Sequence, residues 1–272
     1  MKILDRAAVI LLNLCLLVVF IIAPALMTAS DPGYYEDQFE KNGIYSHTDK
    51  DGNEKRTVIF YIGGNYQNYA EFDNGQLDAL AKHIIDYLFG DKETFALTMD
   101  NVKLNGELTD GVEIFGATAV SHMKDVKVLM HAALVAAVIS AVLLVISISY
   151  IIIRRKEAAP FLLKYTLIFY AAILLFIVIF VLITLFSEWE LIRHEPEYFL
   201  DLLWRNVHHL LFPFQPEKFE NSFFNDTLTE ILTLELFLDA LVIVFVTLFS
   251  ALAAWLATAI VIKRLTSKRS TT

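Results

Sequence analysis

The sequence has little cysteine and little basic charge, and both shortages restrict its function. Of the 272 residues only Cys15 is a cysteine, which excludes an intrachain disulfide and every cysteine-based metal cluster. Cys15 lies in an apolar run, where we expect its thiol to stay protonated and inert. The 22 Lys and Arg residues are outnumbered by 31 Asp and Glu residues, which gives a net charge of -9. Because nucleic-acid backbones are bound by clustered Lys and Arg, a nucleic-acid partner is disfavoured.

Familiar catalytic motifs are also missing from the sequence. The chain has no Gly-rich phosphate loop, no zinc-protease helix and no nucleophile elbow. Charged residues make up 19% of the chain and hydrophobic residues 56%, and the mean hydropathy is +0.53. This composition is too apolar for an ordinary soluble domain and indicates a membrane protein.

Four apolar runs are long enough to cross about 30 Å of hydrocarbon, which takes roughly 20 helical residues. They lie at about 7–27, 128–153, 161–186 and 236–262. None has an acid or base in its interior, which disfavours a transporter or pump because ion pathways place ionisable groups inside the membrane. The first run, preceded by basic residues, has a cleaved signal peptide as its alternative interpretation, but its length favours a retained helix.

The distribution of charge predicts the orientation of these runs. Residues 1–6, 154–164 and 263–272 together hold 10 Lys and Arg but only 2 Asp and Glu. Residues 31–125 hold 8 basic and 18 acidic residues, and residues 188–239 hold 3 and 11. By the positive-inside rule, both termini and the turn between the second and third runs are cytoplasmic, and the two acidic segments face outward.

We therefore predict an α-helical integral membrane protein with four transmembrane helices and an extracellular α+β cap. Its predicted parts, in chain order, are the first transmembrane helix (1–30), the cap (31–125), two transmembrane helices joined by a short cytoplasmic turn (126–187), an aromatic-rich extracellular segment at the bilayer surface (188–235), and the fourth transmembrane helix with a basic tail (236–272). Within the cap, apolar residues from Leu77 to Leu88 recur at helical spacing, and we expect His83 and Asp86 on the surface of that helix.

The candidate chemistry lies where the cap meets the membrane. His122 comes about one and a half turns before the second run, and Asp125 is its i+3 neighbour on a helix. Such a carboxylate orients an imidazole and raises its basicity, although a solvated His at an interfacial helix start is the simpler alternative. His208 and His209 are adjacent, so only one is expected to face a shared site. A metal site from His122, Asp125, His208 and Asp226 is a further alternative, but it lacks short ligand spacing.

The whole pattern resembles the bacterial lipoprotein intramolecular transacylases, a family of four-helix membrane proteins. The resemblance covers nearly the entire topology, and its most specific piece is Ser-His-Met-Lys-Asp-Val-Lys at 121–127. The helical stretch 80–88 and Asn-Asp-Thr-Leu at 225–228 add weaker support. In the aromatic motif the chain departs from the family, because Val207 and Leu211 replace phenylalanines and a second histidine is present.

The resemblance implies an enzyme at the outer face of the bacterial cytoplasmic membrane, whose partners are diacylglyceryl lipoproteins and membrane lipids. An acyl chain would move from the sn-2 oxygen of the glyceryl group to the α-amino group of the lipoprotein's own N-terminal cysteine, leaving a lyso-lipoprotein. The two histidines that serve this transfer map to His122 and His208. No cofactor and no metal are expected.

The other candidate residues are expected to position the catalytic groups or to bind the substrate. The predicted orienting residues are Asp125, Asp226, Ser121, Lys124 and His209. The predicted substrate contacts are Trp204, Phe212, Asn206 and Arg205. Donors for the tetrahedral oxyanion are expected among Lys124, Asn206, Arg205 and Ser121.

Two alternative functions stay open. A lipid-ester hydrolase or an intermolecular acyltransferase would use the same histidines, but would release free fatty acid or add one acyl group to the lipoprotein. A non-catalytic, membrane-anchored sensor or assembly protein would keep its function when both histidines are replaced.

Overall fold

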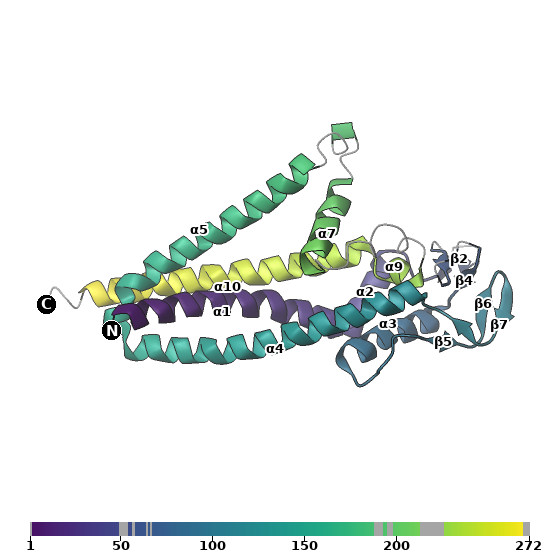
Figure 1. The fold of residues 1–272 in the computed structure, drawn as a ribbon, viewed down its shortest axis with the longest axis horizontal. Coiled ribbons are helices and arrows are strands. Elements are labelled where there is room, and N and C mark those ends of the chain that lie inside the picture. The colour runs from purple at the N-terminus through teal and green to yellow at the C-terminus, as the bar shows by residue number, and fades with distance from the viewer. Residues whose placement is uncertain are drawn as a thin grey trace. The chain divides into compact units, whose positions relative to one another are not determined.

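Four long apolar helices dominate the computed structural model, which describes residues 2–48, 54–55, 58–63, 65, 67–187, 193–194, 198–212 and 226–268. Each is long and apolar enough to span a membrane: α1 (Lys2–Ser30), α4 (Ala117–Ile153), α5 (Arg155–Ser187) and α10 (Leu234–Lys268) (Figure 1). They contain the four predicted runs and confirm the predicted membrane class. Much of the predicted aromatic-rich segment lies outside the described residues, at 188–192, 195–197 and 213–225.

The chain divides into two compact units. The helical unit comprises residues 1–25, 133–207 and 241–272, and the cap unit comprises residues 26–132 and 208–240. The long helices α1, α4 and α10 contribute residues to both units, as does α7 (Tyr198–Leu211).

In the helical unit, a polar cluster ties the start of α1 to the turn between α4 and α5. Asp5 is 1% exposed, accepts a hydrogen bond from the Tyr150 hydroxyl at 2.9 Å, and pairs with Arg154 at 3.6 Å. Apolar side chains from all four long helices form a core: Val9, Leu12, Leu16, Ile151, Ala158, Leu162 and Ala259. The start of α1, the α4–α5 turn and the end of α10 thus lie at one end of this unit (Figure 1).

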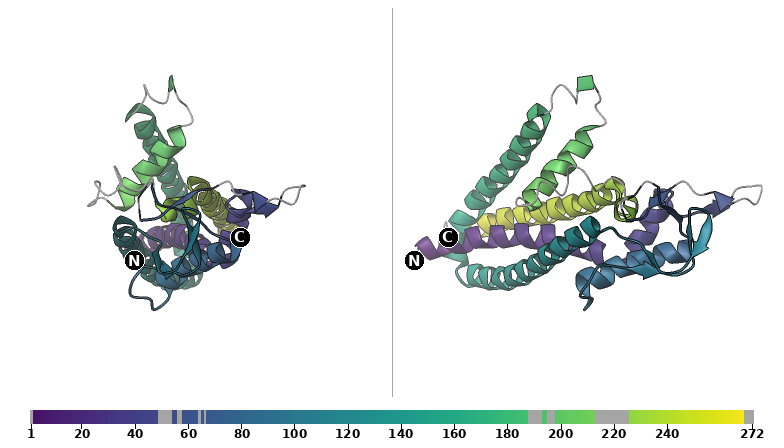
Figure 2. Two further views of the ribbon diagram at one scale, coloured as in Figure 1. Left: turned by 90° about the vertical axis from the view of Figure 1, so that its right-hand side faces the viewer. Right: turned by 45° about the vertical axis from the view of Figure 1, so that its right-hand side comes forward.

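Helix α5 exposes most of its apolar surface. It contacts α10 where the Tyr170 hydroxyl donates to the Leu252 carbonyl at 2.7 Å, and then diverges from α10 in every view (Figures 1 and 2). Leu174 and Phe176 on the diverging part are 62% and 60% exposed. A large exposed apolar surface marks a membrane interaction, and here it suits a helix that faces lipid.

In the cap unit, the chain turns sharply where α1 ends and α2 (Pro32–Lys41) begins. Asp31 has an extended backbone, with φ -96° and ψ 109°, and its side chain accepts a hydrogen bond from the Gly33 N–H at 3.0 Å. Pro32 occupies the first helical position, where its missing N–H costs nothing. This N-cap starts a new helix directly after the first membrane-spanning helix.

The strands of the cap are short and antiparallel. The largest sheet has the order β3-β4-β6-β7, formed by Phe60–Tyr61, Tyr69–Glu71, Val102–Leu104 and Glu107–Thr109. Two further pairs join β1 (His47–Thr48) to β2 (Glu54–Lys55) and β5 (Thr98–Met99) to β8 (Val112–Glu113). Together with the cap helices, these strands make up the predicted α+β cap.

The predicted cap helix is α3 (Asn74–Phe89), and it carries much of the cap core. A capping box starts it, in which the Asp73 side chain accepts from the Gln76 N–H at 2.7 Å and Gln76 accepts from the Asp73 N–H at 3.0 Å. Its fully buried side chains pack with aromatic residues from other elements, and this core includes Leu77, Leu80, Ile84, Phe39, Phe72 and Phe95.

The expected surface position of His83 on α3 is wrong, since His83 is 5% exposed. It lies one turn from the buried Leu80 and Tyr87 and therefore shares their face. The Lys92 ammonium lies 2.9 Å from Nδ1 and can only donate, so Nδ1 accepts and the Nε2–H donates to the Phe95 carbonyl at 2.9 Å. Burial, together with the charge of Lys92, lowers the pKa of His83.

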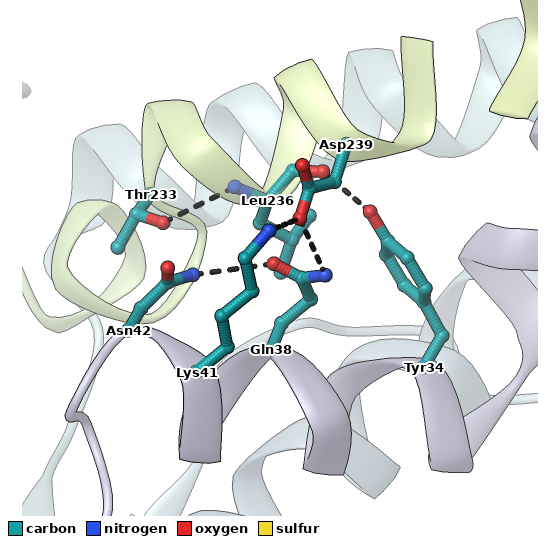
Figure 3. Close-up of polar contacts among 7 residues, drawn as sticks. All are labelled: Tyr34, Gln38, Lys41, Asn42, Thr233, Leu236 and Asp239. Atoms are coloured by element: carbon teal, nitrogen blue, oxygen red, sulfur yellow. Dashed lines mark hydrogen bonds and ion pairs between the residues drawn. The ribbon is translucent and has the colours of Figure 1, made fainter. Parts of the chain in front are cut away.

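Polar contacts hold the first turns of α10 against α2 inside the cap unit (Figure 3). The Tyr34 hydroxyl donates to the Leu236 carbonyl, Gln38 Nε2 donates to Asp239 Oδ2 at 3.0 Å, and Lys41 forms an ion pair with Asp239. Burial and the nearby Asp239 carboxylate raise the pKa of Tyr34 to about 12. Tyr34 therefore stays a neutral donor at physiological pH.

Candidate active site

The start of α4 places His122 inside the cap unit. His122 is 8% exposed, and the next residue, Met123, is 2% exposed and belongs to the cap core. Two long-range contacts fix this part of the helix against the end of α3. The Lys127 ammonium donates to the Lys92 carbonyl at 2.7 Å, and His131 Nε2 lies 3.1 Å from the Leu88 carbonyl. The Leu88 carbonyl belongs to the last turn of α3, where carbonyl groups lack partners within the helix, and the Lys92 carbonyl belongs to the chain that follows α3.

Three rings from two distant parts of the chain meet in the cap unit. The centroid of the His122 ring lies 6.4 Å from that of His208 and 5.3 Å from that of Phe212, with the Phe212 ring presented edge to face. His208 and Phe212 are themselves 6.2 Å apart and stacked. The structure thus brings together both predicted histidines and one predicted substrate contact, which we name the ring cluster.

The adjacent histidine, His209, is also partly buried. On α7 its side chain leaves the helix roughly 100° from that of His208. The ring contacts described for His122 involve His208 and Phe212, which makes His208 the better partner within the described part of the chain.

Asp226 connects two chain segments that are far apart in sequence. Its Oδ2 accepts from the Gly116 N–H at 2.8 Å, and its Oδ1 accepts from the Leu228 N–H at 3.0 Å, which caps α9 (Thr227–Ile231). The side chain is buried, at 3% exposure for the residue. Burial raises the pKa of Asp226, while the two backbone N–H groups act in the opposite direction.

Ser121 and Lys124 lie on a different face of α4 from His122. Helical geometry places them roughly 100° and 160° around the axis from it. Both line an open pocket of about 450 Å³. Its other walls come from α3, from the chain that follows α3, from β8 and the chain after it, and from α4: Tyr87, Glu93, Thr94, Phe95, Ala96, Leu97, Thr98, Glu113, Phe115, Ala117 and Val120. The structure therefore brings these two residues to the pocket rather than to the ring cluster.

Asp125 lies on α4 within electrostatic range of Tyr87 on α3. Burial raises the pKa of the Tyr87 hydroxyl, and the charge of Asp125 raises it further. The predicted pairing of Asp125 with His122 stays a prediction.

The other predicted substrate contacts belong to the part of α7 that lies in the helical unit. Asn206 Nδ2 donates to the hydroxyl of the buried Thr184 on α5 at 3.1 Å. Trp204 is partly buried and Arg205 is exposed. Their roles as substrate contacts stay predictions, but Asn206 already has a structural role in joining two helices.

Sequence reasoning did not find Gly116, whose backbone is the partner of Asp226. An added Cβ at Gly116 would lie 2.9 Å from Asp226 Oδ2 and 3.1 Å from the backbone of Gly63. The available signal was a glycine directly before a long helix, but nothing in the sequence pointed to an aspartate 110 residues away.

Metal ligands do not gather at this site in the part of the chain that the structure describes. No group of three or more His, Cys, Asp or Glu side chains is arranged there to hold a metal ion.

Comparisons with known proteins agree with the resemblance seen in the sequence. A family model described as lipoprotein intramolecular transacylase Lit matches residues 9–205. A solved structure of the membrane integral lipoprotein intramolecular transacylase Lit from Bacillus cereus has the same fold, with a TM-score of 0.58 at 14% sequence identity. That likeness covers 100% of this chain and 99% of the other. No curated protein matches the chain.

Proposed function

This chain belongs to the lipoprotein intramolecular transacylase family, and from that premise we propose that it rearranges diacylglyceryl lipoproteins, with His122 and His208 carrying the proton transfers. An acyl chain moves from the sn-2 oxygen of the glyceryl group to the α-amino group of the lipoprotein's N-terminal cysteine. The observation that carries this proposal is the approach of the two imidazole rings to 6.4 Å. The two residues are 86 positions apart in the chain, and the partly buried ring of Phe212 lies beside both imidazoles.

The two histidines suit the proton transfers that this reaction requires. An α-amino group has a pKa of about 7.7 to 8.0 and is largely protonated at neutral pH, whereas free imidazole titrates near 6.5. One neutral imidazole accepts a proton as the amine attacks the ester carbonyl. As the tetrahedral intermediate collapses, the C–O bond breaks and an imidazolium gives a proton to the glyceryl oxygen. One N–C bond has then replaced one C–O bond, and one proton has moved from nitrogen to oxygen.

No enzyme nucleophile is needed, because the amine and the ester belong to one molecule. The protein's main task is to hold the substrate folded so that the two groups meet. Orientation of this kind contributes roughly 7 to 11 kcal/mol in well-arranged intramolecular reactions. A buried, aromatic-lined position for His122 also excludes water, which would otherwise hydrolyse the ester.

The proposed orientation puts the ring cluster at the outer face of the bacterial cytoplasmic membrane. Both termini and the α4–α5 turn are cytoplasmic in this arrangement, in keeping with their excess of Lys and Arg. The start of α1, this turn and the end of α10 share one end of the helical unit, which supports a single orientation for all four helices. Lipoprotein substrates carry their acyl chains in the same leaflet that the cap would face.

Supporting roles are proposed for five of the other predicted residues. Phe212 contacts both histidine rings and would wall the reaction space. Trp204, Arg205 and Asn206 lie roughly half a turn to one turn before His208 on α7 and would contact the glyceryl or acyl part of the substrate. Asp125 would orient the His122 ring.

The experiment uses the purified full-length protein in detergent and a synthetic diacylglyceryl lipopeptide with a free amine. Mass spectrometry with fragmentation follows the product for the wild type and for His122→Ala, His208→Ala and, as a matched control, His209→Ala. We expect an unchanged mass with one acyl group moved to nitrogen, abolished in the first two variants and retained in the control. Loss of an acyl group as free fatty acid would establish a hydrolase instead, and full activity of both variants would refute the proposed roles of the histidines.

A further inference from the structure

The carboxylate of Asp226 serves the beginnings of two helices at once. One oxygen caps α9 through the Leu228 N–H, and the other accepts from Gly116, the residue that directly precedes α4. The Gly116 carbonyl accepts the first backbone hydrogen bond of α4, from the Val120 N–H at 3.0 Å, so Gly116 is the N-cap of this helix. His122 follows six residues later on the same unbroken helix, about 9 Å further along its axis.

The junction around this carboxylate is tightly packed. Next to Asp226, the Thr227 hydroxyl donates to the Tyr61 carbonyl at 3.1 Å. Gly116 also lies so close to the backbone of Gly63 that a Cβ would meet it at 3.1 Å. The loop after β3, the start of α4 and the start of α9 are therefore joined at one point, and the carboxylate of Asp226 is the side chain that reaches α4.

We propose that Asp226 is a positioning residue for the transacylation reaction, which fixes the start of α4 to α9 and thereby sets the place of His122 against His208 and Phe212. This inference rests on the proposed function. Asp226 itself touches backbone N–H groups and acts through α4 on His122. A shift of a reacting group by about 1 Å is enough to lower a rate by about 100-fold. A link that fixes the position of His122 therefore affects the rate of the reaction.

Asp226→Asn should keep one of the two hydrogen bonds of this carboxylate and remove the other. Asparagine is as good an N-cap as aspartate, so its one amide oxygen can keep the bond to the Leu228 N–H and preserve α9. Its NH₂ group then faces the Gly116 N–H, where two donors meet and no hydrogen bond forms. The substitution therefore breaks the link to α4 while it changes the size of the side chain very little.

The matched control is Asp73→Asn on α3. Asp73 is also an N-cap aspartate that accepts a backbone N–H, at 2.7 Å from Gln76, but it does not contact the start of α4 in the described structure. Gly116→Ala is a second test, because its Cβ would push on Asp226 Oδ2 from 2.9 Å without changing any charge. It keeps the inference testable if Asp226→Asn does not fold.

The measurement is kcat and KM for the diacylglyceryl lipopeptide, with the thermal midpoint of each variant in the same detergent. We expect Asp226→Asn to lower kcat by about 10- to 100-fold with KM changed less than about twofold, and Gly116→Ala to lower kcat in the same direction. Asp73→Asn should keep both its cap bond and the wild-type kcat, since asparagine is as good an N-cap as aspartate. A kcat for Asp226→Asn equal to that of Asp73→Asn, or a loss that lies in KM alone, overturns the positioning role. Absence of rearranged product with the wild type is a different failure, since it overturns the proposed function itself.

Hydrogen exchange of the Gly116 amide gives a readout that does not depend on activity. In the wild type this N–H is bonded to a buried carboxylate, so it should exchange slowly. Asp226→Asn should expose it to exchange while the Leu228 amide stays protected. Equal protection of the Gly116 amide in wild type and variant would show that the Asp226 carboxylate does not hold the start of α4 through this hydrogen bond.

Discussion

The contact between α2 and the start of α10 predicts how much stability α2 loses when Asp239 is replaced. Replacing Asp239 by Ala removes the acceptor of the Gln38 amide, and Gln38 is only 6% exposed. An unpaired buried donor costs about 1–3 kcal/mol. The ion pair with Lys41 adds at most about 1 kcal/mol, because the Lys41 side chain is 58% exposed and solvent screens the charges. Most of the loss should therefore come from the hydrogen bond.

Hydrogen exchange with mass spectrometry measures this loss as faster opening of α2. Since about 1.4 kcal/mol corresponds to a tenfold change in an equilibrium constant, exchange in residues 34–41 should accelerate by about 5- to 140-fold in Asp239→Ala. Asp239→Asn keeps an oxygen for Gln38 and should accelerate exchange by less than about 5-fold. Glu235→Ala, an exposed carboxylate on the same turn region of α10, is the control and should leave α2 unchanged.

Two results would refute this reasoning. If Asp239→Asn accelerates exchange as strongly as Asp239→Ala, the charge pair dominates and the hydrogen-bond argument is wrong. If none of the three variants changes the exchange of α2, the polar contacts in Figure 3 do not hold this helix in place.

Three further predictions concern stability. The thermal midpoint of the cap should fall as pH drops below 6.5, because burial and the charge of Lys92 lower the pKa of His83 in the folded state, so the unfolded chain binds the proton first. The loss of stability continues until the pH passes below the pKa of His83 in the folded state. Thermal midpoints recorded from about pH 8 to about pH 5 check this, and Lys92→Met should make them depend less on pH. Phe39→Ala should cost about 3–5 kcal/mol because this fully buried ring leaves a cavity, and denaturant titration of the cap checks it against an exposed substitution. Asn206→Leu should cost about 0.5–1.5 kcal/mol by removing the bond to Thr184, and a thermal midpoint equal to that of the wild type would contradict this.

The membrane helices were predictable because hydrocarbon imposes a strict local rule. A spanning segment must satisfy its own backbone and present apolar side chains over about 20 residues, so α1, α4, α5 and α10 are visible as four runs. The helical conformation at the start of α4 was also predictable, since the segment from Ser121 to Lys127 continues directly into the second run.

The arrangement of the site could be predicted only in part. The resemblance to a family indicated both His122 and His208, but their approach depends on contacts between segments far apart in the chain. Local spacing also misplaced His83, because the same 3.6-residue period describes a helix with one buried face or two. The link between Asp226 and Gly116 has no local signature, since a backbone N–H leaves no trace in residue type.

The burial of Cys15 has a practical consequence for spectroscopy. This residue is the chain's one cysteine, and at 3% exposure on α1 its sulfur is closed to bulky thiol reagents. The wild-type sequence therefore already serves as a background for site-directed labelling, without a preliminary substitution. A cysteine introduced at an exposed position such as Lys124 would carry a spin label or fluorophore alone, and would report on the cap while a lipopeptide binds.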